Sequence, residues 1–293
     1  MENNKLVELQ VDILDRVQHN IEAYQARGEL QFPPDYSLGN ALKSAWLMLQ
    51  GVKTAKSAGE KPVLEACTRP SIIASLLSMA IQGLNPDKKQ CYFIAYAATL
   101  TLMRSYFGAV VVAKRIDANI EDIPAEVVYE DDEFEYETIH GKKYIIKHKS
   151  SLKNIDKTKI TAAYAEVIYS DGRAPIATVM TMEEIKQSWK QSQANPVAAD
   201  GSIAPGTTHG KFTADMCKRT VINKACKSII NNSNDASLVA RIARQNDTEM
   251  AAVEVDADIE IEANQGEPID PPAAPEEKPA EAQATIPGSG VQA

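Results

Sequence analysis

Apolar residues recur at steps of three and four along the first part of the chain, which is the spacing of amphipathic helices. The clearest run predicts a helix over residues 5–26, whose apolar side is formed by Leu6, Leu9, Ile13, Val17 and Ile21. The same periodicity predicts a second helix over residues 37–56, after a break at Phe32–Asp35. A third helix is expected from about Pro70 to Gly83, because proline favours a helix start and glycine a helix end.

The pattern changes between residues 89 and 181, where aromatic and β-branched residues are typical of strands. Residues 89–103 predict a strand pair or one bent strand, residues 104–115 a short helix, and residues 125–181 several strands. Asp171 and Gly172 form a dipeptide that is typical of a tight hairpin turn.

Helical periodicity returns after this segment. It predicts helices over residues 183–192, 211–230 and 236–244, with a loop over residues 195–208 that contains glycine and proline. The expected class is α+β, with N-terminal helices, a central mainly antiparallel β-sheet packed with a long helix, and C-terminal helices.

The net charge of −9 is unevenly distributed. From Asn246 to Ala293 there are 12 acidic residues and one basic residue, whereas residues 1–245 carry 30 basic and 28 acidic side chains. The C-terminal segment is rich in proline and alanine and has too little apolar surface to offset its ordering entropy. We expect an N-terminal helical region (1–60), a central core (61–245) and a disordered acidic tail (246–293).

Motifs for nucleotide, metal and cofactor binding are missing from the sequence. It has no GxxxxGK[ST] loop for nucleotide phosphates, and its four cysteines and four histidines lack the paired spacing of zinc sites. Apolar runs are too short to span a bilayer. We expect no catalytic residue, no metal site and no cofactor, and a cytoplasmic protein.

The acidic run Glu130–Glu133 leaves one enzymatic alternative, a magnesium-dependent nuclease. A charge run between two strands is more often a solvated turn, which makes this the weaker interpretation.

Seven lysines lie between His140 and Lys159. In an extended strand Lys143 and Lys147 share one face, and Lys149 follows closely. Such a row suits a nucleic-acid backbone, but lysine also protects exposed sheet edges, and both interpretations stay open.

A second basic cluster lies on the predicted helix 211–230. Because an α-helix turns by about 100° per residue, its apolar residues gather on one side. The opposite side carries Arg219, Thr220, Asn223, Lys224 and Lys227, and no acidic residue occurs between Cys217 and Asn234. Because phosphates are anionic and accept hydrogen bonds, this face fits a DNA backbone. Lys211 and Lys218 complete the candidate set, with Lys218 at the margin of the apolar side.

A third candidate segment begins at Arg104 and includes Tyr106 and Phe107, followed by Lys114 and Arg115. Exposed aromatic rings stack on the bases of single strands. Aromatic residues at a helix start are more often part of the core, so this signal is weak by itself.

Several of these segments, taken in order, resemble the RecT family of phage single-strand annealing proteins. The resemblance runs from about Arg69 to Asp235. It is carried by Gly83–Pro86, Tyr92–Ile94, Tyr106–Gly108 with Lys114 and Arg115, Val127–Glu137, the strands on either side of Asp171–Gly172, and Thr208–His209 ahead of Asp215–Thr220. One position differs, because Phe107 stands where the family usually has a basic residue, and Arg104 is the nearest replacement.

The resemblance implies an ATP-independent protein that binds single-stranded DNA and anneals it to its complement. It implies a homo-oligomer, as a ring or helical filament, that holds the annealed duplex intermediate in a basic groove. It further implies that the protein acts in the cytoplasm of a bacterial host, with a phage exonuclease and the host single-stranded-DNA-binding protein as possible partners.

Two questions stay open from the sequence. A nonenzymatic structural or scaffold oligomer of a phage is the main alternative, because lysines also serve solubility. The acidic tail has three possible roles, which are competition with DNA, recruitment of a basic partner and solubility.

Overall fold

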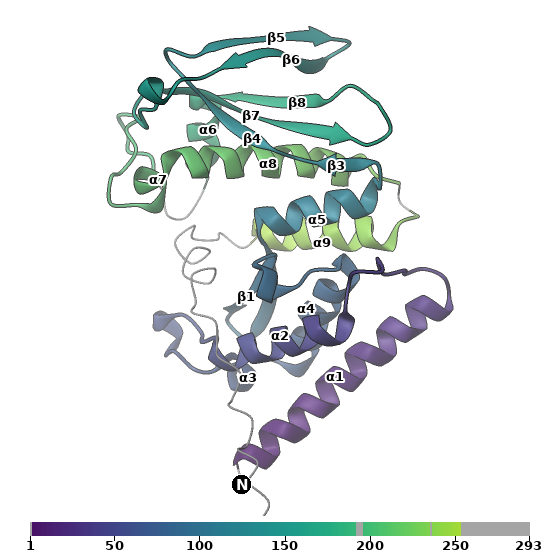
Figure 1. The fold of residues 1–293 in the computed structure, drawn as a ribbon. Helices are drawn as coiled ribbons and strands as arrows, with labels where there is room; N and C mark the ends of the chain where they lie inside the picture. The colour runs from purple at the N-terminus through teal and green to yellow at the C-terminus, as the bar shows by residue number, and fades with distance from the viewer. Residues whose placement is uncertain (1, 192–195, 235, 253–293) are drawn as a thin grey trace, which may run out of the picture.

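The computed structural model of the chain describes residues 2–191, 196–234 and 236–252. It confirms the α+β class (Figure 1). A sheet with a long helix beneath it, which we call the sheet region, lies above a group of helices around a two-stranded hairpin, which we call the helical region.

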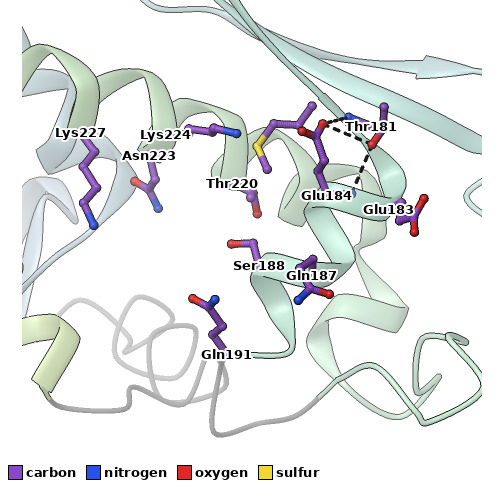
Figure 2. A pocket seen from close by; sticks show the side chains of 11 residues that line it. Thr181, Glu183, Glu184, Gln187, Ser188, Gln191, Thr220, Asn223, Lys224 and Lys227 are labelled. Atoms are coloured by element: carbon purple, nitrogen blue, oxygen red, sulfur yellow. Dashed lines mark hydrogen bonds between the residues drawn. The ribbon is translucent and has the colours of Figure 1, made fainter.

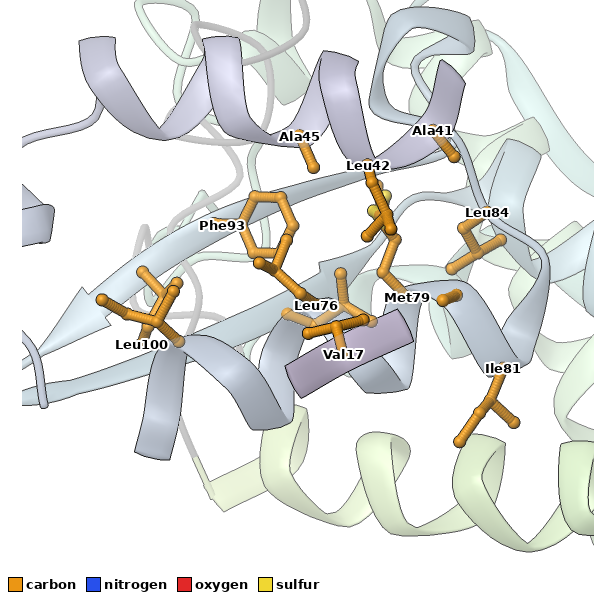
Figure 3. Close-up of a cluster of buried hydrophobic side chains, with 14 of the residues drawn as sticks. Val17, Ala41, Leu42, Ala45, Leu76, Met79, Ile81, Leu84, Phe93 and Leu100 are labelled. Carbon is orange, nitrogen blue, oxygen red and sulfur yellow. The ribbon is translucent and has the colours of Figure 1, made fainter. Parts of the chain in front are cut away.

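The helical region is formed mainly by the N-terminal part of the chain. Its elements are α1 (Glu2–Ala26), α2 (Leu38–Gly51), α3 (Val63–Ala66), α4 (Arg69–Gln82), the hairpin strands β1 (Cys91–Tyr96) and β2 (Thr99–Arg104), and 3-10 turns at Lys56–Ala58 and Pro86–Lys88. The Thr68 hydroxyl accepts a hydrogen bond from the Ser71 amide and so caps α4, which ends at Gly83 in a left-handed conformation. Leu76, Met79 and Phe93 are among the buried side chains that join these elements (Figure 3).

The sheet region is antiparallel throughout its described pairings. Its strands are β3 (Ile120–Asp122), β4 (Ala125–Tyr129), β5 (Glu133–Ile139), β6 (Lys142–Lys149), β7 (Ile160–Tyr169) and β8 (Ile176–Thr181), with a 3-10 turn at Leu152–Asn154. The order is β3-β7-β8-β6-β5, and β4 also pairs with β7. The β7–β8 hairpin turns at Asp171 and Gly172, as the sequence predicts. β6 joins β8 through the pair Lys143 and Ala177.

Five helices that follow the β1–β2 hairpin in the chain complete both regions. They are α5 (Tyr106–Ile116), α6 (Met182–Trp189), α7 (Thr208–Lys211), α8 (Thr213–Asn231) and α9 (Leu238–Ala252). α8 packs under the sheet and shares a second core with it, to which Met180, Ile185 and Val221 belong. α5 and α9 lie between the two regions (Figure 1).

Several boundaries differ from those predicted. α2 ends at Gly51 rather than near Lys56, and the predicted helix 211–230 is divided into α7 and α8 at Phe212. Residues 89–103 form a strand pair, which decides between the two options that the sequence left open.

The C-terminal boundary also shifts. α9 continues to Ala252, so residues 246–252, which the sequence places in a disordered tail, are helical. The rest of that predicted tail, residues 253–293, lies outside the described residues. Among the described helices, none has the length and apolar character needed to cross a bilayer.

Candidate nucleic-acid interface

The apolar residues of α8 are buried and its polar residues are exposed, and both sets lie on the helix faces that the sequence predicts. Cys217, Val221 and Ala225 are buried against the sheet. Asn223, Lys224 and Lys227 are exposed on the other side of the helix. The core contacts of α8 therefore fix the direction in which its cations point.

A hollow of about 780 Å³ lies between α6 and α8. From α8 it is lined by Thr220, Asn223, Lys224 and Lys227, and across from them lie the uncharged side chains of Gln187, Ser188 and Gln191 (Figure 2). Both walls thus offer hydrogen-bond donors, the α8 wall adds positive charge, and Glu183 and Glu184 at the start of α6 add two carboxylates to the lining.

α6 is held firmly against α8. The Thr181 hydroxyl accepts a hydrogen bond from the Glu184 amide while the Glu184 carboxylate accepts one from the Thr181 amide, which forms a capping box. At the other end of α6, the Trp189 indole donates to the Thr220 hydroxyl at 2.9 Å, and that hydroxyl donates to the Met216 carbonyl at 2.8 Å. Thr220 therefore links α6 to α8, and its hydroxyl group is already used in these two hydrogen bonds.

A second hollow, of about 700 Å³, lies between α8 and strands β6 and β8. Lys142 and Lys143 line it from β6, and Lys224 and Glu184 line both hollows. The pKa of Glu184 lies below its ordinary value, first because the Thr181 amide donates to it and also because Lys224 and Lys143 are close. The two hollows therefore share Lys224 and Glu184 in their lining, and we refer to the two hollows together as the groove.

Most cations of this groove are not neutralised by neighbouring acids. Within the described part of the chain, Lys142, Lys224 and Lys227 have no carboxylate at ion-pair distance. Lys143 donates to the Val179 carbonyl at 3.4 Å and lies 5.4 Å from the centre of the Tyr136 ring. The groove is thus open to an anionic ligand.

An aromatic pair lies at the start of α5. The ring centres of Tyr106 and Phe107 are 4.0 Å apart, and Phe107 is 46% exposed. Arg219 of α8 places its guanidinium 5.1 Å from the Tyr106 ring centre, and its Nη1 atom is buried without a hydrogen-bond partner. The structure therefore brings the aromatic candidates next to the α8 candidates, which are far away in the sequence.

Arg104 and Arg115 point inward instead. The Arg104 side chain is 4% exposed, forms an ion pair with Asp247 and donates to the Gln82 side chain at 2.7 Å. Arg115 donates to the main-chain carbonyls of Ile81 at 2.6 Å and Gln31 at 2.9 Å. Both arginines hold the fold together, and Arg104 is not at the surface to replace the basic residue missing at Phe107.

Three further candidates have acidic partners at the surface. Lys114 pairs with Asp122, Lys147 with Glu133 and Lys218 with Glu126. Lys149 and Lys211 are exposed, at the end of β6 and of α7, but neither lines the two hollows. The structure therefore gathers only part of the predicted set into the groove.

The carboxylate of Asp132, in the acidic run Glu130–Glu133, is shielded from solvent and stabilises the turn between β4 and β5. It accepts hydrogen bonds from the Tyr129 amide and the Asn154 side chain, each at 3.0 Å, and lies 3.2 Å from His148 Nε2. Burial opposes its ionisation, but these hydrogen bonds outweigh burial and lower the pKa of Asp132 to about 2.

The neighbouring glutamates form surface ion pairs, Glu130 with Lys159 and Glu133 with Lys147. Nowhere in residues 2–191, 196–234 and 236–252 do three or more histidine, cysteine or acidic side chains gather to hold a metal ion. These contacts place the run in a turn, as the sequence predicts, but the turn is not solvated throughout, because the Asp132 carboxylate is shielded from solvent.

Sequence reasoning missed the α6 wall and Lys142. Gln187 and Ser188 are neutral residues on a short helix and Gln191 follows its end, and such residues carry no signal for a binding site until α8 is placed opposite them. Lys142 belongs to the predicted lysine run, and only its position at the start of β6 distinguishes it from the other lysines.

Comparison with known protein families matches residues 39–261 to the RecT family. No curated protein matches the chain. The family match spans more than half of the 293 residues and includes α6, α8 and the aromatic pair. The chain therefore belongs to the RecT family, whose members anneal single-stranded DNA in phage recombination.

Proposed function

We propose that this protein binds single-stranded DNA along the groove between α6, α8 and β6 and anneals it to a complementary strand without ATP. The proposal assigns phosphate contacts to Lys143, Asn223, Lys224 and Lys227, and base stacking to Phe107 beside Tyr106 and Arg219. It places this function in the core of residues 61–245.

The observation that carries the proposal is the pair of adjoining hollows that share Lys224. Their cations lie on a rigid helix and a strand and lack acidic partners among the described residues. A cationic groove neutralises phosphates, releases counterions and lowers the repulsion between two approaching strands. Contacts to the backbone leave the base edges free to pair.

The absence of a nucleotide-binding loop in the sequence supports ATP independence. Membership of the RecT family supports a homo-oligomer, as a ring or helical filament, that also holds the annealed duplex intermediate. A phage exonuclease and the host single-stranded-DNA-binding protein are proposed partners, in the cytoplasm of a bacterial host.

The test is an annealing assay with two complementary labelled oligonucleotides and no ATP. We expect the protein to accelerate duplex formation and the variant Lys224→Glu/Lys227→Glu to lose this activity while keeping its melting temperature. No acceleration by the wild type would contradict annealing, and shortened strands would indicate a nuclease. Full activity of the folded double variant would contradict the proposal that DNA binds in the groove.

A further inference from the structure

The cationic side of the groove is also suited to an acidic segment of the same chain. We infer that the acidic segment of residues 254–262 binds the α8 wall of the groove at Lys224 and Lys227 and competes there with DNA. This inference rests on the proposed function, because it assigns a competitor to the same surface.

The first observation is where α9 ends. Arg104 pairs with Asp247, and the Asn246 side chain donates to the Leu102 carbonyl at 2.8 Å, so the last turns of α9 are anchored to β2. Lys227 of α8 lies within electrostatic reach of Asp247: burial raises the pKa of Asp247, and the charges of Arg104 and Lys227 oppose this rise. Ala252, the end of α9, is only about 7.5 Å further along the helix axis.

The second observation is the sequence that follows. Acidic residues occupy every second position from residue 254 to residue 262, namely Glu254, Asp256, Asp258, Glu260 and Glu262. The intervening positions are valine, alanine and isoleucine, and no basic residue occurs between residues 246 and 277. In an extended chain, alternate residues share one side at a spacing of roughly 6.6 Å. The segment would then present a single regular row of negative charges, as a DNA strand does.

The third observation is the state of the α8 wall. Lys224 and Lys227 face a hollow that is open to solvent, and no carboxylate among the described residues pairs with either of them. A ligand tethered close to its site has an effective concentration on the order of millimolar, so even a weak contact competes with a free ligand. DNA, which offers many phosphates at once, displaces the segment.

Two full-length variants with equal net charge test the inference. The first, the proximal variant, replaces Glu254, Asp256, Asp258, Glu260 and Glu262 by their amides. The second, the distal variant, does the same to Glu267, Asp270, Glu276, Glu277 and Glu281, which lie among prolines and do not alternate. Affinity for an oligo-dT strand is measured by fluorescence anisotropy at low salt.

We expect the proximal variant to bind oligo-dT about tenfold more tightly than the wild type, and the distal variant less than about threefold more tightly. Equal affinities of the two variants would overturn the inference, because net charge alone would then explain any gain. Adding Lys224→Gln/Lys227→Gln to both the wild type and the proximal variant should abolish the difference between them. If the two lysine substitutions do not weaken DNA binding at all, the proposed function fails instead.

A second measurement does not depend on affinity. Carbodiimide joins carboxylates to lysines that they contact, and mass spectrometry locates the products. We expect links between residues 254–262 and Lys224 or Lys227 in the free protein, and their loss when oligo-dT is added. Links that persist at saturating DNA, or that involve only lysines outside the groove, would overturn the inference.

Discussion

The helical region and the sheet region use positive charge in opposite ways. Arg104 and Arg115 point into or along the helical region, where one pairs with a partly buried acid and both donate to main-chain carbonyls. Lys224 and Lys227 of the sheet region lie in an open hollow and have no acidic partner among the described residues. The same kind of side chain is structural in one region and available to a ligand in the other.

This difference shows that clustering in the sequence is a poor guide to a binding role. Arg104 and Arg115 lie on either side of the exposed Phe107, yet both are largely withdrawn from solvent. A cation becomes available when burial is low and no acid or carbonyl has already engaged it.

The largest effect is expected from Arg104→Ala. Removing this side chain leaves Asp247 as an unpaired, partly buried charge, so the free energy of unfolding should fall by about 3 kcal/mol in urea denaturation. The double variant Arg104→Met/Asp247→Leu should recover most of this loss, because neither charge remains. An Arg104→Ala protein that keeps its stability but binds DNA weakly would break the comparison, since Arg104 would then act as a groove residue.

Asp132→Asn should lower the free energy of unfolding by about 1–3 kcal/mol near neutral pH, because a buried charged acceptor loses its hydrogen bonds. Because the folded-state pKa of Asp132, about 2, is below the ordinary value of 3.8, its contribution is complete above the ordinary value and is lost as the pH falls towards 2. Acid unfolding followed by circular dichroism should therefore show wild type and variant converging at the acidic end. A constant difference over the whole range would mean that the carboxylate charge has no role.

Lys224→Gln/Lys227→Gln should weaken oligo-dT binding by about tenfold at low salt and change the free energy of unfolding by less than about 0.5 kcal/mol. The slope of log affinity against log salt should become shallower by about 1.4, since each lost phosphate contact contributes about 0.7 for single strands. Lys43→Gln/Lys61→Gln is the matched control, because both lysines are exposed in the helical region. An equal loss of affinity in the control would show that binding depends on overall charge and not on the groove.

The smallest effect is expected from Glu184→Gln. This carboxylate lies where the two hollows meet, and its removal should strengthen oligo-dT binding by about two- to fivefold. Glutamine also completes a capping box, so α6 should stay formed. Weaker binding with an unchanged melting temperature would show that Glu184 supports the ligand rather than repelling it.

Local patterns predicted most of the fold. Helical periodicity located α1, α4 and α8, and the Asp171–Gly172 turn located the β7–β8 hairpin. The helical wheel of α8 also separated Val221 and Ala225 from Lys224 and Lys227 correctly, because burial of a helix follows its own sequence. These features depend on residues that are close together along the chain.

Whether an individual cationic side chain is engaged within the fold or free at the surface depends on residues that are distant in the sequence. It could not be predicted from local patterns. Arg104 is buried because Asp247, 143 residues later, lies on α9 beyond residue 244, where the sequence pattern predicts that this helix ends. Arg115 is engaged because the main chain at Gln31 and Ile81 passes beside it. No local pattern encodes either contact.

α8 buries one face against the sheet and exposes lysines on the other, and this double role limits where insertions and deletions are tolerated. A helix turns by about 100° per residue, so deletion of a single residue near Cys217 would rotate every later side chain by that angle. Lysines would then be driven towards the sheet and apolar residues towards solvent. Insertions and deletions that preserve both stability and DNA binding are thus expected outside the helix, for example in the segment of residues 196–207.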